Sequence, residues 1–356
     1  MNGGGSSMPY LKKQISRLFL ILCISPVIIL FQNCSPSMQS GLSGLSTSPT
    51  NDSGHSDQPA GQDNSSSDSN KILLAQQISA GSASTCIIDD SQQVKCWGSS
   101  DSGSGIFGTS TALGASFTAL AISGLGPVKK MSINAGGITT HACAITTNDT
   151  VKCWGRNESG QLGNNSITNS KTPVDVFNLG PVKSIALGGY HTCAITINDT
   201  VKCWGYNGSG QIGNNSTVNS KIPIDVQNLN AVKSLATGSH TTCAITMNDT
   251  VKCWGNNSNG QLGNNSTTNS STPVDVLNLS SVKSVYIGNS HACAITMNEA
   301  VKCWGYNFYG QLGNDSTVNS STPVDVLNLA SIKSIAIGNY HTCAITSDNH
   351  VRCWGG

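Results

Sequence analysis

Cysteine is the residue whose spacing could do the most chemistry in this 356-residue chain. Twelve of its 14 cysteines form six pairs with nine residues between the partners, and the last five pairs lie 50 residues apart. Paired thiols of this kind could close disulfides or hold a metal. The pairs are Cys86 with Cys96, Cys143 with Cys153, Cys193 with Cys203, Cys243 with Cys253, Cys293 with Cys303, and Cys343 with Cys353.

The spacing favours disulfides over zinc. Structural zinc sites usually place two cysteines about two to four residues apart and bring a second pair close by. Between Cys193 and Cys203 the chain reads TCAIT, turns at Ile197-Asn198-Asp199 and returns as TVKC. Folding this hairpin symmetrically sets the two cysteines opposite each other, near disulfide distance. We therefore expect six disulfides, no metal and no cofactor.

Four short segments in each unit must position these cysteines. In the unit 182–231 they are VKSIALG, TCAIT, VKCWG and PIDV, which are β-branched or alternating and are separated by Gly, Asn, Asp and Pro. Self-similarity at a fixed period is the sequence signature of solenoids and propellers. Four strands in about 50 residues predict one blade of a β-propeller, with the six tryptophans packed between blades.

The repeat also resembles a known family. The strings G-x-x-H-T-C-A-I-T, V-K-C-W-G-x-N-x-x-G-Q-L-G and P-V-D-V are similar to the regulator of chromosome condensation repeat, in its cysteine-bearing, exported bacterial form, over residues 75–356. The resemblance implies a β-propeller, typically of about seven blades. Relatives include a nuclear guanine-nucleotide exchange factor for a small GTPase, secreted β-lactamase inhibitors and a plant UV-B photoreceptor.

The predicted fold class is all-β, with a propeller of six four-stranded blades whose last blade is incomplete. The units lie near 75–124, 128–181, 182–231, 232–281, 282–331 and 332–356. The first unit departs from the others, with Ser84 at the histidine position and Gly105-Ile106-Phe107-Gly108 replacing the GQLG turn. The sixth unit lacks its GQLG turn and fourth strand, and Ser66 to Ser69, which would supply that strand in register, are not strand-like. A truncated seven-blade ancestor is the alternative.

The N-terminus predicts export. Three basic residues precede an apolar run of 14 residues from Leu18 to Phe31, which is short for a membrane span and typical of a signal peptide. Cys34 directly follows and resembles the lipidated cysteine of bacterial lipoproteins, although Asn33 is unusual before it. We expect residues 1–34 to be a lipoprotein-type signal and Cys34 to be lipidated. Ordinary cleavage and an uncleaved anchor are the alternatives.

Composition limits the possible partners. Residues 35–70 contain no aromatic side chain, so we expect a disordered Ser/Gly/Asn linker. Charged residues make up 10% of the chain and the net charge is +1, which excludes the concentrated basic field of a nucleic-acid-binding protein. The expected location is the bacterial cell envelope, as an outer-membrane lipoprotein or at the cell surface, with the membrane contacted through the lipid.

The repeated polar residues are expected to be structural. One histidine per unit, at His141, His191, His291 and His341, with His240 displaced by one residue, is spread around a ring and does not converge. We expect these histidines to form hydrogen bonds within each blade. The repeated lysines and aspartates are expected to be solvated strand positions. No nucleophile with a base partner, phosphate-binding glycine motif or carboxylate pair stands out, so the protein is predicted not to be an enzyme.

Two variable segments carry the expected function. One follows each Trp-Gly, and the other precedes the first cysteine of each pair. In a four-stranded meander the loop between the first and second strands and the loop between the third and fourth strands lie at the same end of the sheet, so we expect both variable segments on one face of the propeller. Five of the seven tyrosines fall in these segments, and tyrosine with small polar neighbours is typical of adaptable binding surfaces. The predicted partner-binding residues are Tyr190, Tyr206, Tyr306, Phe308, Tyr309 and Tyr340.

The sequence therefore predicts a non-enzymatic, envelope-anchored propeller that binds a protein or glycan through one loop face. A secreted enzyme inhibitor of the propeller β-lactamase-inhibitor kind is the first alternative. An exchange factor for a small GTPase is the second, and the signal segment argues against it because such a GTPase is cytoplasmic.

Overall fold

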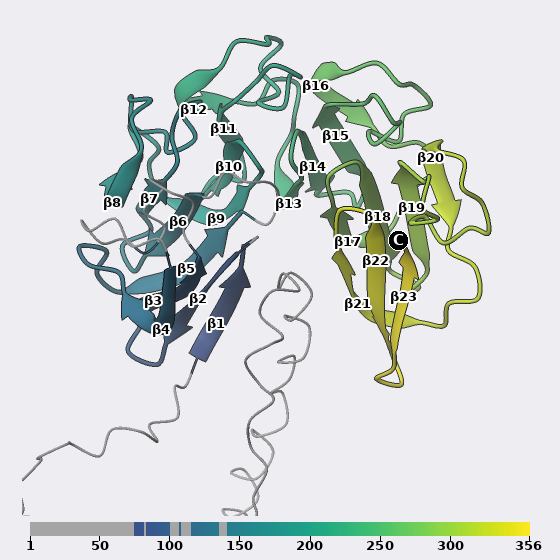
Figure 1. The fold of residues 1–356 in the computed structure, drawn as a ribbon. Helices are drawn as coiled ribbons and strands as arrows, with labels where there is room; N and C mark the ends of the chain where they lie inside the picture. Colours follow the sequence, from purple (N-terminus) through teal and green to yellow (C-terminus); the bar gives the residue numbers. More distant parts are fainter. Residues whose placement is uncertain (1–74, 82, 100–106, 108–114, 135–140) are drawn as a thin grey trace, which may run out of the picture. The chain divides into compact units, whose positions relative to one another are not determined.

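The computed structural model describes residues 75–81, 83–99, 107, 115–134 and 141–356 (Figure 1). The chain divides into two units, Met1–Asn33 and Cys34–Gly356, and every described residue belongs to the second. The expected signal segment, Cys34 and the expected linker lie outside the described residues. Within these ranges every regular element is a β-strand, and no helix is long and apolar enough to cross a membrane.

Six separate antiparallel sheets follow one another along the chain as the blades of a propeller, which confirms the predicted fold (Figure 1). Blade 1 consists of β1 (Ala75–Ala80), β2 (Ser84–Asp89), β3 (Val94–Ser99) and β4 (Ala115–Ala121). Blade 2 consists of β5 (Val128–Ile133), β6 (His141–Thr146), β7 (Val151–Gly155) and β8 (Ser170–Asp175). Blade 3 consists of β9 (Val182–Leu187), β10 (His191–Thr196), β11 (Val201–Gly205) and β12 (Ser220–Asp225).

The remaining blades repeat this order, and the last is incomplete as predicted. Blade 4 consists of β13 (Val232–Thr237), β14 (Thr241–Thr246), β15 (Val251–Gly255) and β16 (Ser270–Asp275). Blade 5 consists of β17 (Val282–Ile287), β18 (His291–Thr296), β19 (Val301–Gly305) and β20 (Ser320–Asp325). Blade 6 has three strands, β21 (Ile332–Ile337), β22 (His341–Thr346) and β23 (Val351–Gly355).

The first strand of each blade lies innermost. The first strands of successive blades contact one another in chain order from β1 through β5, β9, β13 and β17 to β21. Each fourth strand pairs only with the third strand of its own sheet and forms its outer edge. Proline lacks a backbone N–H and is tolerated on such an edge, which accounts for its recurrence in the fourth strands, as at Pro223 of β12.

The hairpin between the second and third strands places the cysteines as predicted. In blade 3, Cys193 pairs with Cys203, and Ala194 pairs with Lys202. All six disulfides are formed, and the Cα atoms of the bonded cysteines are 4.0–4.1 Å apart. The disulfides join Cys86 to Cys96, Cys143 to Cys153, Cys193 to Cys203, Cys243 to Cys253, Cys293 to Cys303, and Cys343 to Cys353. Each disulfide therefore fastens the two middle strands of one blade.

The surroundings of the disulfides differ only in the last blade. In blades 1 to 5 both cysteines of each pair are fully buried, including the third-strand partners Cys96, Cys153 and Cys253. In blade 6 Cys353 is exposed, because no fourth strand lies beside β23 among the described residues. Five of the disulfides are therefore part of the apolar core.

Adjacent blades share their apolar cores. Cys193 and Ile195 of blade 3 lie in one buried cluster with Val232, Ala244 and Trp254 of blade 4. Equivalent clusters join the other four pairs of successive blades. Four of the tryptophans are fully buried in these clusters, so the prediction that tryptophan packs between blades is confirmed.

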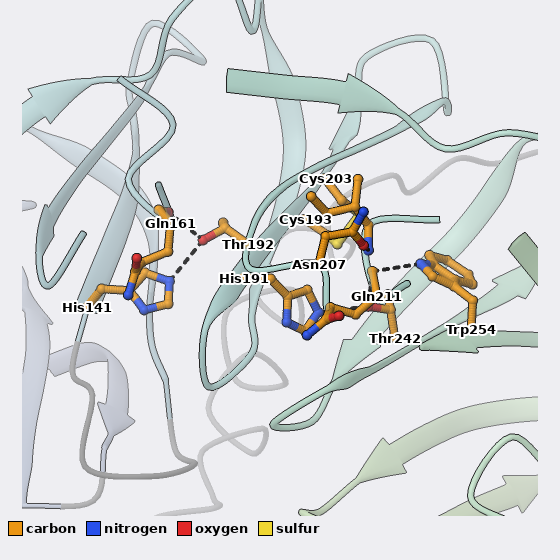
Figure 2. Close-up of a disulfide and its surroundings, with 11 residues drawn as sticks. His141, Gln161, His191, Thr192, Cys193, Cys203, Asn207, Gln211, Thr242 and Trp254 are labelled. Carbon is orange, nitrogen blue, oxygen red and sulfur yellow. Dashed lines mark hydrogen bonds between the residues drawn. A yellow bond between two sulfur atoms is a disulfide. The ribbon is translucent and has the colours of Figure 1, made fainter. Parts of the chain in front are cut away.

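A hydrogen-bonded chain crosses the junction between blades 2 and 3 (Figure 2). The carbonyl oxygen of Gln161 in blade 2 accepts a bond of 2.9 Å from Thr192 Oγ1 of blade 3. It accepts a second bond of 2.9 Å from Trp204 Nε1, and Figure 2 shows the equivalent bond from Trp254 to Gln211. Because the hydroxyl proton of Thr192 is used there, His141 Nε2, 2.9 Å from Thr192 Oγ1, must be the donor to it. His191 and His291 make the same contact with Thr242 and Thr342.

The expectation of histidine bonds within each blade is therefore wrong. The ring at the start of the second strand faces the next blade, where the partner threonine lies. The sequence varies accordingly: where Ala142 or Ala292 replaces that threonine, the preceding blade has Ser84 or Thr241 instead of histidine. Histidine and threonine are thus present together or absent together at every junction between successive blades.

Burial keeps these histidines neutral. Desolvation lowers the pKa of His141 and His191 to about 3 and that of His291 to about 4. In the unfolded chain the same groups bind a proton below about pH 6.5. Between those values these three histidines together bind three more protons in the unfolded state than in the folded state, so lowering the pH favours unfolding.

We predict that these three histidines lower the free energy of unfolding by about 4 kcal/mol per pH unit as the pH drops from about 6 to 4.5. Urea unfolding at several pH values measures this slope. His191→Gln, which keeps a side-chain N–H donor, removes one of the three titrating groups and should reduce the slope by about a third. A slope unchanged by His191→Gln would contradict this explanation.

Each disulfide closes an 11-residue loop from one cysteine to the other. Replacing both Cys193 and Cys203 by Ala should lower the free energy of unfolding by about 2.8 kcal/mol through loop entropy, plus a packing loss at this buried site. The matched control is the double replacement of Cys343 and Cys353, where the loop is equally long and Cys353 is exposed. Urea unfolding should show the same entropic loss there with a smaller packing loss, because of the two cysteines only Cys343 is buried. No loss at either site would refute the proposed role of the bridges.

Candidate functional site

The loops that vary between units bring seven rings into two groups. The first aromatic cluster consists of Tyr190, Tyr206 and His240. The second aromatic cluster consists of Tyr306, Phe308, Tyr309 and Tyr340. All six predicted partner-binding residues lie in these clusters. Within the described ranges no ring contact joins the two clusters, so they form two neighbourhoods along one set of loops.

The two variable segments of a blade meet because the backbone ties them together. Tyr206 N donates to Tyr190 O at 2.9 Å, and Gly356 N donates to Tyr340 O at the same distance. Gly205 makes this approach possible: its φ is 106°, and a Cβ there would lie 2.6 Å from Tyr190 O. The invariant glycine after each tryptophan thus allows the loop before the second strand to meet the loop after the third.

The first cluster spans blades 3 and 4. The rings of Tyr190 and His240 stack with centroids 5.1 Å apart and an interplanar angle of 6°, and Tyr206 lies edge-on to His240 at 5.5 Å. Gln211 Nε2 donates to His240 Nδ1 at 3.3 Å, and burial lowers the pKa of His240. A neutral imidazole therefore completes this half-buried aromatic surface.

The second cluster spans blades 5 and 6 and is more exposed. Tyr309 packs edge-on against Phe308 and Tyr340, with both centroid distances 5.1 Å. The exposed fractions of Phe308, Tyr309 and Tyr340 are 64%, 48% and 49%. Three large apolar rings on adjoining loops therefore remain available to a partner.

A buried asparagine holds the loop that carries three of these rings. Asn307 Nδ2 lies 3.0 Å from Asn314 Oδ1, 2.9 Å from Ser316 O and 3.1 Å from Val318 O. Asn307 Oδ1 accepts a bond from Leu312 N at 2.9 Å. Equivalent asparagines hold the corresponding loops of blades 2, 3 and 4, and all are fully buried. The base of each loop is therefore fixed while the residues at its tip vary.

One polar group beside the second cluster has no hydrogen-bond partner among the residues that the structure describes. Gln311 Oε1 accepts a bond from Tyr309 N at 3.0 Å, but Gln311 Nε2 is buried without a hydrogen bond. The equivalent Gln211 Nε2 of blade 3 donates to His240 Nδ1 of blade 4, whereas the corresponding position for Gln311 is Tyr340 of blade 6. A buried amide donor without a partner is costly, and an acceptor atom of a ligand could satisfy it.

Sequence reasoning missed two members of this site. His240 occupies the position of Tyr190 and Tyr340, and its displacement by one residue from the other histidines was the available signal. Gln311 belongs to the repeated GQLG motif, so only the side chains around it distinguish it from its equivalents in other blades.

The RCC1-like domain family matches residues 39–356, which include every described strand. The chain belongs to this family. A comparison with curated protein sequences gave no match.

Solved structures share the fold of this RCC1-like propeller. Human WBSCR16 is 21% identical with a TM-score of 0.68, and the match covers 80% of this chain and 78% of that one. Yeast RCC1 (Prp20), solved bound to Kap60, is 20% identical with a TM-score of 0.67, and the match covers 78% of this chain and 69% of that one. A separate structure of Prp20p from Saccharomyces cerevisiae is 21% identical with a TM-score of 0.68, and the match covers 78% of this chain and 71% of that one. At these identities the likeness establishes the fold alone.

We predict that Asn307→Ala lowers the free energy of unfolding by about 3 kcal/mol, because several buried backbone groups lose their partner. Chemical denaturation measures the loss. The neighbouring Phe308→Ala is the matched control, and since that ring is largely exposed its effect should stay within about 0.5 kcal/mol. Equal effects of the two substitutions would contradict the role given to Asn307.

Proposed function

We propose that this RCC1-like propeller is a non-enzymatic binding protein of the bacterial cell envelope that engages a protein partner through the second aromatic cluster. The observation that carries the proposal is the contiguous, exposed surface of Phe308, Tyr309 and Tyr340 beside the unpaired amide of Gln311. The first aromatic cluster supplies a second, less exposed contact area on the same set of loops.

The chemistry of the loops indicates the kind of surface that would fit. Residues 306–312 and 338–341 contain no Asp, Glu, Lys or Arg. Aromatic side chains bury large areas at a small entropic cost and are enriched among residues that dominate binding energy. A complementary partner would offer an apolar, uncharged patch with an acceptor oxygen for Gln311 Nε2.

Similar folds support a protein as the partner. Yeast Prp20 has been solved bound to Kap60, and its binding to Gsp1p and histones has been described. These are partners of Prp20, and the low identity transfers none of them to this chain. They illustrate that the same propeller architecture serves protein recognition.

The envelope location rests on the sequence. The basic residues and apolar run before Cys34 have the form of a lipoprotein signal, and six disulfides suit an oxidising compartment outside the cytoplasm. Lipidation of Cys34 would hold the propeller at a membrane surface.

Capture from an envelope extract tests the function. The variant with Phe308, Tyr309 and Tyr340 replaced by Ala should bind the captured protein at least about thirtyfold more weakly, since such anchors are worth about 2 kcal/mol or more in total. Its melting temperature should change little because these rings are exposed. The control replaces Lys302 and Asp325, an exposed pair on the outer strands, and should bind normally.

Retained binding by the triple variant would refute the proposed surface. Direct binding of purified envelope oligosaccharide to the propeller, with no protein captured from the extract, would show that the partner is a glycan and that the protein proposal is wrong.

A further inference from the structure

The hairpins between the second and third strands carry apolar residues at their tips. In blade 3, Asp199 N donates to Thr196 O at 3.0 Å, so Ile197 lies at the corner of this turn. Corner positions of turns are usually occupied by polar residues or glycine and proline. Met247 and Met297 take the place of Ile197 in blades 4 and 5, and the three side chains are 49%, 43% and 53% exposed in chain order. Three consecutive blades therefore present an apolar tip to their surroundings.

The connections between blades add apolar residues at the same end of the sheets. Each fourth strand ends beside the start of the third strand, as Asp225 of β12 lies opposite Lys202 of β11. The residues two positions beyond β8, β16 and β20 therefore lie at the hairpin end, and all three are exposed: Phe177, Leu277 and Leu327. We define the hairpin face by these three residues together with Ile197, Met247 and Met297.

Backbone hydrogen bonds join the hairpin face into one surface. Ile197 N donates to Pro181 O at 3.2 Å, in the connection that precedes its blade. Asp199 O accepts a bond of 3.2 Å from Val232 N, at the start of the next blade. Equivalent bonds link the hairpin of blade 4 to blade 5 and the hairpin of blade 5 to the connection before it. The apolar tips are therefore held in fixed succession around the ring.

The charges between these tips neutralise one another. Lys183 lies 2.6 Å from Asp199, and Lys233 lies 2.5 Å from Asp249. A surface without a field of one sign offers little to a highly charged partner such as a nucleic acid. A bilayer accepts single apolar side chains without a matching shape, whereas a protein interface needs a closely packed complementary surface. Separate apolar tips among paired charges therefore suit a lipid surface.

The N-terminal connection enters the propeller at this same face. Ala75, the first residue of β1, pairs with Asp89 at the end of β2. Gln92 N donates to Asp89 O at 2.9 Å and closes the hairpin turn of blade 1. The chain that leads from Cys34 therefore joins the propeller at the hairpin end. A lipid on Cys34 would attach this end to the membrane.

The aromatic clusters lie at the opposite end of the blades. Tyr190 directly precedes β10 and Tyr206 directly follows β11, whereas the hairpin joins the end of β10 to the start of β11. A propeller whose hairpin face meets the membrane therefore turns its aromatic clusters away from it.

We propose that the hairpin face lies against the lipid bilayer, with Ile197, Met247 and Met297 inserted at the boundary between headgroups and acyl chains. The proposal rests on the envelope anchoring described under the proposed function, and it adds which side of the propeller the membrane contacts. One acyl chain gives only marginal membrane binding, so the tips supply a second apolar contact and fix the orientation. The aromatic clusters then remain accessible to a protein partner.

Fluorescence quenching by brominated lipid tests the orientation. Cys34–Gly356 forms one compact unit that includes every described strand, and within it only Cys34 lies outside the six disulfides. The mature chain can therefore be coupled through Cys34 to maleimide phosphatidylethanolamine in vesicles of phosphatidylethanolamine and phosphatidylglycerol. This coupling supplies the anchor chemically and no partner is added, so a negative result is distinct from a failure of the proposed function.

Met247→Trp reports on the hairpin face. Relative to the unsubstituted chain, its added fluorescence should be quenched at least about twofold more strongly than that of Val318→Trp, because apolar side chains at a membrane interface lie roughly 5–10 Å deep. Val318 is the matched control, since it is 73% exposed and lies just before β20, at the opposite end of the sheet.

A second set of variants tests the tips themselves. Leu277→Trp places the reporter elsewhere on the hairpin face, and its quenching should fall to the level of Val318→Trp when Ile197, Met247 and Met297 are all replaced by Ser. Blade 6 has Ser347 at the tip position, so the turn accommodates serine.

Equal quenching of Met247→Trp and Val318→Trp would overturn the proposal. Quenching of Leu277→Trp that survives the three serine substitutions would also overturn it, because the tips would then not hold the face to the bilayer. Light scattering of the lipid-free chain should show a monomer; a dimer that the serine substitutions dissociate would assign the hairpin face to a second copy of the chain.

Discussion

At four of the five junctions between successive blades, the packing depends on one backbone carbonyl. A buried tryptophan must find an acceptor for its indole N–H, and each of the four tryptophans from Trp204 to Trp354 finds it at 2.9 Å on a glutamine carbonyl of the preceding blade. That carbonyl belongs to the GQLG or GQIG turn, whose last glycine lies against the indole. A Cβ at Gly163 would be 2.7 Å from Trp204 Nε1. The turn and the tryptophan therefore constrain each other across the junction.

This constraint explains which parts of the loops can vary. The long loop after each Trp-Gly is fixed near its start by a buried asparagine and further on by the glutamine carbonyl. The residues that flank the asparagine contribute nothing to these bonds through their side chains. Blade 4 accordingly has Asn256 and Ser258 where blade 5 has Tyr306 and Phe308, and both loops keep the backbone bond from the following glycine to the asparagine carbonyl, from Gly260 N to Asn257 O and from Gly310 N to Asn307 O. The residues that flank the asparagine can therefore change from blade to blade and form different binding surfaces, while the loop backbone keeps its shape.

Periodicity and turn chemistry were sufficient to predict the blades. The pairing of Cys193 with Cys203 followed from the symmetry of a hairpin, because only one register opposes two cysteines ten positions apart. The direction of the histidines did not follow, since periodicity shows which residues recur but not which neighbouring blade they face. The signal was present in the sequence, because the residue at the histidine position varies together with the residue at the threonine position of the next unit. His141 is followed by Thr192 and His191 by Thr242, whereas Ser84 is followed by Ala142 and Thr241 by Ala292. The unpaired state of Gln311 Nε2 depends on side chains from two blades and could not be derived from one repeat.

The central claim is that the loop tips of blades 5 and 6 form the binding surface while the junctions stay rigid. Hydrogen exchange of the propeller with and without its captured partner tests this claim most directly. The account predicts slower exchange on binding at residues 306–310 and 339–341, and no change in the fourth strands β12, β16 and β20. Protection confined to those outer strands, with none at Phe308, Tyr309 or Tyr340, would contradict it.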